Sequence, residues 1–97
     1  MNKILTIIEA KVASDKWDML KQEYSAVDKN SLPKTILDSY LIQDSVNPET
    51  WRIITIWENR EAIDEYRKSV ETPAWILVFR AVGAEPALAI SEIIISK

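Results

Sequence analysis

The chain has 97 residues, of which 47% are hydrophobic and 28% are charged, and its formal net charge is −3 at pH 7. This composition predicts one globular domain over residues 1–97, and the interspersed acidic and basic residues argue against nucleic acid as a partner. The sequence has no cysteine and no histidine, which excludes disulfides, zinc–thiolate sites, iron–sulfur clusters and histidine-ligated haem.

The first predicted element is a strand over residues 3–12, a run rich in isoleucine. A helix is predicted over residues 15–29, with Ser14 as its N-cap and an end near Asn30. Its apolar residues have the three-and-four spacing of one helical face, at Trp17, Leu20, Tyr24 and Val27.

Residues 35–58 have the pattern of a β-hairpin. The second strand is predicted over residues 35–44, with one side formed by Ile36, Tyr40 and Ile42. Asn47-Pro48 is a turn signal, and residues 50–58 then alternate as a third strand. One face of this strand carries Trp51, Ile53, Thr55 and Trp57, and the other carries Arg52, Ile54, Ile56 and Glu58.

The last part of the chain predicts two helices and a strand. Asn59 is the expected N-cap of a helix with a buried stripe of Ala62, Ile63, Tyr66 and Val70. Thr72-Pro73 predicts a second helix start, with Thr72 as the cap and Pro73 at the first helical position. Gly83 has the position of a left-handed C-cap, and residues 87–95 form the final strand.

This order of elements predicts an α+β fold of ferredoxin-like (split βαβ) topology, an antiparallel four-stranded sheet with helices on one face. The first and last strands are apolar at nearly every position, so we expect both of their faces to be buried. A homodimer formed through the sheet face would supply that cover.

Two apolar stretches, residues 4–8 and 93–95, are far shorter than the roughly 20 residues that a membrane-spanning helix needs. The N-terminus also lacks the pattern of a signal peptide. We therefore expect no membrane association and a cytoplasmic location.

Residues 51–63 (WRIITIWENREAI), followed by Tyr66 and Thr72-Pro73-Ala74, resemble the central motif of the antibiotic biosynthesis monooxygenase family. In that family a strand ends in a Trp-Glu pair, a polar cap opens a helix, and a Thr-Pro or Ser-Pro element begins a short second helix. The resemblance implies a dimeric α+β barrel with a pocket between sheet and helices. It also implies cofactor-independent oxygenation of a quinol-like or polycyclic aromatic small molecule.

The haem-degrading branch has a similar layout but uses an Asn, a Trp and a His. By position these fall on Glu9, Tyr66 and Ile76. None of the three is retained, so haem degradation is not expected.

An oxygenase without metal or flavin needs a substrate that reacts with oxygen once deprotonated. The protein then supplies a dry pocket, a proton acceptor and a group that stabilises the anion. No cofactor and no metal site are expected. The predicted catalytic residues are Glu9, Tyr66 and Arg80. The predicted residues that bind an aromatic ligand are Tyr40, Trp57, Glu58, Asn59, Trp75 and Phe79.

Each of these residues also has an ordinary structural interpretation. Aromatic side chains at strand or helix spacing most often belong to a core, and glutamates on strands often pair with cations across strands. The apolar helix at residues 75–82 either lines a pocket or packs at the dimer interface. The alternative function is a non-catalytic dimeric domain that binds a small ligand or is purely structural, and a polyketide isomerase or cyclase is a third. An enclosed cavity of about 300 Å³ or more beside Trp57, Tyr66 and Trp75 would favour a ligand site.

Overall fold

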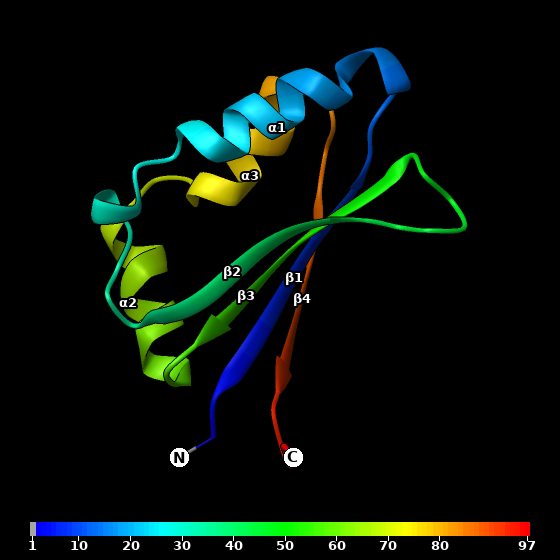
Figure 1. The fold of residues 1–97 in the computed structure, drawn as a ribbon. Helices are drawn as coiled ribbons and strands as arrows, with labels where there is room; N and C mark the ends of the chain where they lie inside the picture. The colour runs from blue at the N-terminus through cyan, green and yellow to red at the C-terminus, as the bar shows by residue number, and fades with distance from the viewer. Residues whose placement is uncertain (1) are drawn as a thin grey trace.

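A four-stranded antiparallel sheet forms the centre of the computed structural model, which describes residues 2–97 (Figure 1). Its strands are β1 (Ile4–Lys11), β2 (Ile36–Gln43), β3 (Thr50–Trp57) and β4 (Ala87–Glu92). They are arranged in the order β2-β3-β1-β4. This is the ferredoxin-like topology that the element order predicts.

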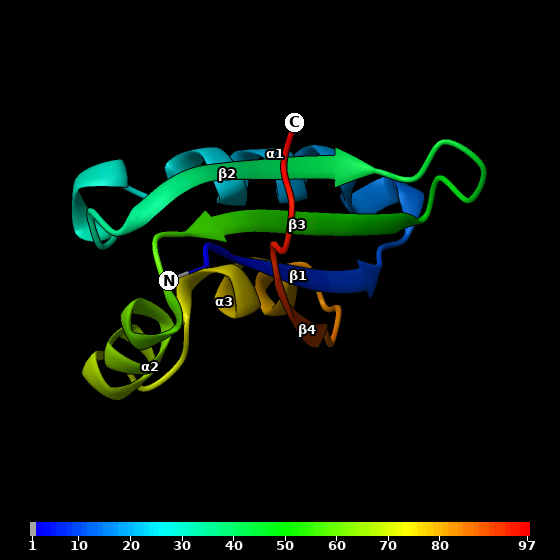
Figure 2. The same ribbon diagram turned by 90° about the horizontal axis from the view of Figure 1, so that it is seen from below.

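Three α-helices cover one side of this sheet. They are α1 (Trp17–Ala26), α2 (Arg60–Ser69) and α3 (Ala74–Ala81), with short 3₁₀ turns at η1 (Ser14–Lys16) and η2 (Lys29–Ser31). Figure 2, seen from below, shows the strands in front of α1 and α3, with α2 beside one end of the sheet. Among the described residues, no helix has the length and apolar character needed to cross a membrane.

The two central strands, β1 and β3, pair along their whole length, from Ile4 opposite Trp57 to Lys11 opposite Thr50. Because side chains alternate along a strand, every second residue of each strand faces the helices. All of these helix-facing residues are buried: Ile4, Thr6, Ile8, Ala10, Trp51, Ile53, Thr55 and Trp57. The face predicted for the third strand is therefore confirmed.

The core between sheet and helices has two parts. Under α1 and α3 the fully buried residues include Leu20, Ile53 and Phe79. Under α2 a smaller cluster contains Trp57 and Ile63, with Tyr66 packed against it. Trp75, on α3, packs against Tyr24 of α1 and belongs to the larger part.

Two capping predictions are confirmed. Asn59 Oδ1 accepts a hydrogen bond from the Ala62 backbone N–H at 2.9 Å, and so caps α2. Gly83 has a φ of 77°, which L-residues with a Cβ rarely adopt. At this turn the Ala84 N–H donates to the Phe79 carbonyl at 3.0 Å, which closes the C-terminus of α3.

The structure contradicts several local predictions about the helices. Ser14 lies in η1 and does not cap α1, and α1 ends at Ala26 because the chain is extended at Val27. The N-cap of α3 is Pro73 and not Thr72, so the helix begins one residue later than predicted. Pro73 makes no side-chain capping bond. The Tyr66 hydroxyl, not Thr72, accepts the N–H of Ala74 at the start of α3.

Strands β2 and β4 also differ from prediction. A register shift between Ile36 and Asp38 places Ile36 in the cluster under α2, whereas Tyr40 and Ile42 stay on the opposite face. Strand β4 ends at Glu92, although the Ile93 N–H still donates to the Lys3 carbonyl. In the single chain most of this strand is exposed, as are Ile94 and Ile95 beyond it, at 70% and 80%.

Candidate functional site

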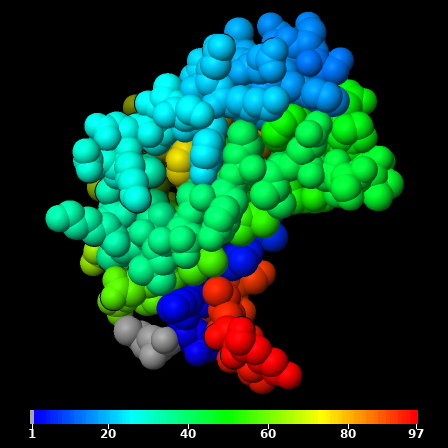
Figure 3. All heavy atoms as spheres, viewed as in Figure 1, coloured from blue at the N-terminus to red at the C-terminus, as the bar shows by residue number. Residues whose placement is uncertain are grey.

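Two cavities lie on the helix side of the sheet and share Trp75 in their walls. The first has a volume of about 250 Å³ and is lined by Thr6, Trp57, Tyr66 and Trp75, with residues of β4 and α3. We call it the Tyr66 cavity. The second, the Tyr24 cavity, has a volume of about 740 Å³ and lies between the end of α1, η2 and β2. In Figure 3 it is the hollow between α1 and β2, in which yellow atoms of the segment that contains α3 are visible.

The walls of the Tyr66 cavity are held by hydrogen bonds between segments distant in the sequence. The Trp57 indole N–H donates to Thr6 Oγ1 at 3.0 Å. The Tyr66 ring lies 5.6 Å from the Trp57 ring, and its hydroxyl accepts the Ala74 N–H at 3.0 Å. This hydroxyl acts as an acceptor toward Ala74, so its own hydrogen is left for another partner.

The rest of the Tyr66 cavity is mostly apolar. Ile8, Ile63, Ile76 and Leu88 contribute to it, and Arg67 and Glu71 are exposed residues at its edge. The interior of this cavity is therefore apolar, and its charged groups are at the edge. Within residues 2–97 there is no group of three or more carboxylate, histidine or cysteine side chains that could hold a metal ion.

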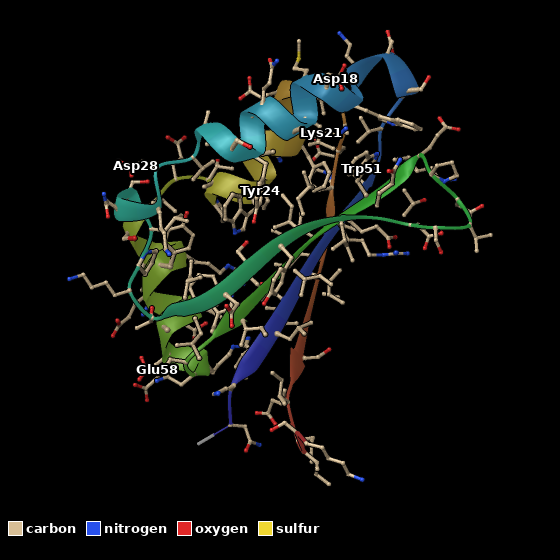
Figure 4. The ribbon with its side chains drawn as sticks, viewed as in Figure 1. Asp18, Lys21, Tyr24, Asp28, Trp51 and Glu58 are labelled. Atoms are coloured by element: carbon tan, nitrogen blue, oxygen red, sulfur yellow. The ribbon has the colours of Figure 1, made fainter. Side chains whose placement is uncertain are left out.

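The Tyr24 cavity has an aromatic wall and a polar floor. The Tyr24 ring stacks on Trp75, with ring centroids 4.8 Å apart and planes 23° apart. The Tyr24 hydroxyl lies 2.9 Å from Ser39 Oγ, which is 3.4 Å from Thr55 Oγ1. Figure 4 shows the Tyr24 side chain extending from α1 into the space between helices and sheet. The cavity lining also includes Lys29, Lys34 and Asp38.

Of the residues predicted to form the site, the structure brings together Trp57, Tyr66 and Trp75. The apolar helix lines both cavities through Trp75, on the side of the sheet opposite its open face. Phe79, which we expected to contact a ligand, is fully buried in the core. Asn59 is engaged as the cap of α2.

The remaining predicted residues lie outside both cavities. Tyr40 is 50% exposed and faces away from the helices, and Glu58 is exposed at the end of β3 (Figure 4). Glu9 also faces away from the helices, because it alternates with the buried Ile8 and Ala10, and its Oε1 lies 2.6 Å from Arg52 Nε. Arg80 pairs with Glu85 at 3.0 Å on the surface. Glu9 and Arg80 therefore do not converge on a shared pocket.

The carboxyl groups with shifted pKa values also lie outside the cavities. Hydrogen bonds from the backbone N–H of Asn47, the Arg52 guanidinium and the Val46 N–H lower the pKa of Asp44. The hydrogen bond from Arg80 lowers the pKa of Glu85. Glu85 is exposed and Asp44 is half-buried, and their shifts reflect ion pairs near the surface and turn geometry.

Sequence reasoning missed polar residues that line the cavities, and also Thr55, which lines neither cavity but lies beside the lining residue Ser39. Thr6 and Thr55 occupy buried-face positions on strands that are otherwise apolar on that face. A hydroxyl in such a position needs a hydrogen-bond partner, and this was the available signal. Arg67, Glu71 and Ser39 carry no comparable signal, since exposed helices and edge strands commonly contain such residues.

The chain is similar to one protein family and to several solved structures. The family model "Antibiotic biosynthesis monooxygenase" matches residues 4–76. No curated protein sequence matches the chain. A solved structure from Bordetella bronchiseptica, proposed to be an antibiotic biosynthesis monooxygenase, has a TM-score of 0.78 and 11% identity, and the match covers 98% of this chain and 100% of that one.

Two other solved structures share the fold. A variant of SnoaB, a cofactor-independent oxygenase from Streptomyces nogalater, has a TM-score of 0.67 and 10% identity over 99% of this chain and 97% of that one. A conserved protein of unknown function from Bacteroides thetaiotaomicron has a TM-score of 0.72 and 16% identity over 95% and 98%. At such identities the likeness concerns the fold alone.

The assignment of Tyr66 as the cap of α3 predicts a stability difference between two variants. Tyr66→Phe keeps the ring against Trp57 but removes the acceptor of the Ala74 N–H, so it should lower the free energy of unfolding by about 1 kcal/mol. Thr72→Ala, at the position that the sequence suggested as the cap, should change it by less than about 0.5 kcal/mol. Urea denaturation followed by circular dichroism measures both, and a larger loss for Thr72→Ala would contradict the assignment.

Proposed function

Because this chain belongs to the antibiotic biosynthesis monooxygenase family, we propose that it is a cofactor-independent monooxygenase acting on a quinol-like or polycyclic aromatic small molecule. The observation that carries the proposal is the Tyr66 cavity, where two indole rings and a phenol line an apolar space between sheet and helices. Ligand pockets are commonly apolar with a few placed polar groups. At about 250 Å³ this cavity is smaller than the enclosed space of about 300 Å³ that we expected of a ligand site, so it would hold the reacting ring and not the whole of a polycyclic substrate.

The reaction that suits this site begins with loss of a proton from the substrate. An anthrone, for example, has an acidic CH₂ group whose carbanion is delocalised onto the ring oxygen and can transfer electrons to dioxygen. The overall change is CH₂ + O₂ → C=O + H₂O, in which one oxygen atom enters the new carbonyl and the other leaves as water. The substrate supplies all the electrons, so no further reductant is required.

The chain's own residues would assist each part of this change. Trp57 and Trp75 would hold the flat ring and exclude water from it. The Tyr66 hydroxyl has a hydrogen left for the substrate oxygen because it acts as acceptor toward Ala74. Glu71 is a carboxylate at the cavity edge that could accept the proton, and the neighbouring lining residue Arg67 would stabilise the resulting anion.

A non-catalytic ligand-binding domain is the second candidate function. It is favoured by the positions of Glu9 and Arg80, because the carboxylate and the cation expected to do the chemistry are paired elsewhere on the surface. A binding domain needs only the cavities. The two candidates differ in whether dioxygen is consumed when an aromatic ligand is added.

Oxygen uptake measured with a panel of quinols and anthrones tests the oxygenase proposal. The protein should consume one dioxygen per anthrone oxidised, and Glu71→Gln should reduce the rate at least ten-fold because it removes the proton acceptor. Glu65→Gln, which changes an exposed carboxylate of α2 that does not line the cavity, should keep the rate. Binding of these compounds without oxygen uptake would instead support the non-catalytic function. An unchanged rate for Glu71→Gln would show that Glu71 is not the proton acceptor.

We also propose that two copies pair through the open face of the sheet. The centre of this face presents mostly apolar or aromatic side chains, among them Leu5, Ile7, Tyr40, Ile54 and Ile56, and the register places Asp38 beside Ile56 and Ser91 beside Leu5. The ion pairs of Arg52 with Glu9 and Asp44 lie toward one end of it. A chain this short buries a modest fraction of its surface alone, so covering this face would add stability.

A charge placed in the centre of the open face should separate the two copies. Ile54→Asp would bury an unpaired carboxylate in the proposed interface, and the protein should become monomeric. Leu77→Asp, at a residue 52% exposed on α3, should remain dimeric. Analytical ultracentrifugation with a circular dichroism check of folding decides this, and a monomeric wild type or a dimeric Ile54→Asp variant would disprove the interface.

A further inference from the structure

A row of hydroxyl groups crosses the helix-covered face of the sheet. Ser39 of β2, Thr55 of β3 and Thr6 of β1 are neighbours in the strand register. Thr55 and Thr6 are buried, at 0% and 5% exposure, in a layer that is otherwise apolar. Buried polar groups are costly unless they form hydrogen bonds, so the bonds of each hydroxyl in this row are constrained.

The hydrogen bonds of three hydroxyls form a chain from the core to the Tyr24 cavity. Thr55 Oγ1 contacts Ser39 Oγ at 3.4 Å, and Ser39 Oγ contacts the Tyr24 hydroxyl at 2.9 Å. Each hydroxyl has one hydrogen to donate, so the chain can run in either of two directions. In one direction Thr55 donates to Ser39 and Ser39 donates to Tyr24. In the other, Tyr24 donates to Ser39 and Ser39 donates to Thr55.

Burial of Thr55 decides between these directions. If Thr55 received a hydrogen bond from Ser39, its own hydrogen would need another acceptor, and among residues 2–97 the hydrogen bond that its side chain makes is the one with Ser39. An unsatisfied donor in the core is unfavourable, whereas a free donor at a cavity can bond to water or a ligand. The outward direction is therefore preferred, and it leaves the Tyr24 hydrogen available at the cavity wall.

From this arrangement we propose that the Tyr24 cavity is a second ligand compartment, in which Tyr24 donates a hydrogen bond to an anionic or carbonyl oxygen of a flat aromatic molecule. The stacked rings of Tyr24 and Trp75 provide an apolar wall for the ligand ring. Lys29 and Lys34 in the lining favour an anionic oxygen over a cationic group, although Asp38 is also present. The volume of about 740 Å³ is well within the range of small-molecule sites.

The Tyr24 cavity and the proposed oxygenation site have one wall residue in common. Trp75 lines both cavities, so a substrate too large for the Tyr66 cavity could extend along Trp75 into the Tyr24 cavity. This link to a substrate rests on the proposed function. The binding of an aromatic oxygen compound beside Tyr24 does not depend on whether oxidation occurs.

Calorimetric titration with 2-hydroxy-1,4-naphthoquinone, a flat compound that is anionic at neutral pH, tests the proposal. The wild-type protein should bind it saturably. Tyr24→Phe, which keeps the stacked ring but removes the donor, should raise the Kd at least about ten-fold. Tyr40→Phe, which removes a phenol hydroxyl on the opposite face of the sheet and lines neither cavity, should leave the Kd unchanged.

Thr55 supplies the sharper comparison because it does not line the cavity. Thr55→Val keeps the side-chain shape but frees the Tyr24 hydroxyl to donate to Ser39, so it should raise the Kd by about five-fold. Thr55→Ser retains the hydroxyl and should bind as the wild type does. A purely structural role for Thr55 would leave the Kd unchanged in a folded Thr55→Val variant.

Absence of saturable binding by the wild type, or an unchanged Kd in Tyr24→Phe, would overturn the proposal. Oxygen uptake distinguishes this failure from failure of the proposed function. If anthrone oxidation persists while Tyr24→Phe binds normally, the oxygenase proposal stands and the second compartment does not. If binding depends on Tyr24 but no oxygen is consumed, the second compartment stands and the oxygenase proposal does not.

Discussion

The register between β1 and β3 determines which side chains this domain can place in a cavity. With Ile4 opposite Trp57 and Thr6 opposite Thr55, one face of the two central strands carries all their buried side chains. A shift of one residue would turn the tryptophans of β3 toward the open face and bring Arg52 under the helices, which would leave a buried charge without a partner. The helices, both cavities and the hydroxyl row depend on this pairing.

Trp75 is the second feature on which the proposed site depends. It is 6% exposed, its ring stacks on Tyr24, and it contributes to the walls of both cavities. The short helix that carries it begins with the bond from the Ala74 N–H to the Tyr66 hydroxyl and ends at the left-handed Gly83. The position of Trp75 therefore follows from α2 and from the turn after α3, as well as from its own helix.

The larger features of the fold could be predicted because they depend on local patterns. Alternation along residues 50–58 divided the side chains of β3 correctly between its two faces, and Asn59 and Gly83 act as the caps that their residue types favour. The side on which Ile36 lies could not be predicted, because the register shift before Asp38 arises from pairing with β3. Tyr66 caps a helix eight residues further along the chain, a tertiary contact without a local sequence pattern.

The structure brings together some of the residues predicted for the site, and the positions of the others have physical causes. Trp57, Tyr66 and Trp75 do meet, as the motif suggested. Glu9 was placed in the site on the family resemblance, and the apolar sequence of β1 did not show which of its two faces lies under the helices. Arg80 meets Glu85 across the turn at Gly83, a pairing that depends on the turn geometry. Tyr24 and Ser39 were not predicted as site residues, because no local sequence pattern indicates the hydrogen bond between them.

The central claim is that aromatic ligands bind between the sheet and the helices, with Trp75 as the common wall. A crystal structure of the protein grown with 2-hydroxy-1,4-naphthoquinone tests this most directly. The account predicts that the ligand lies against Trp75, with one of its oxygen atoms within hydrogen-bond distance of the Tyr24 hydroxyl. A ligand bound only on the open face of the sheet, or cavities closed by the side chains of Tyr24 and Trp75, would contradict it.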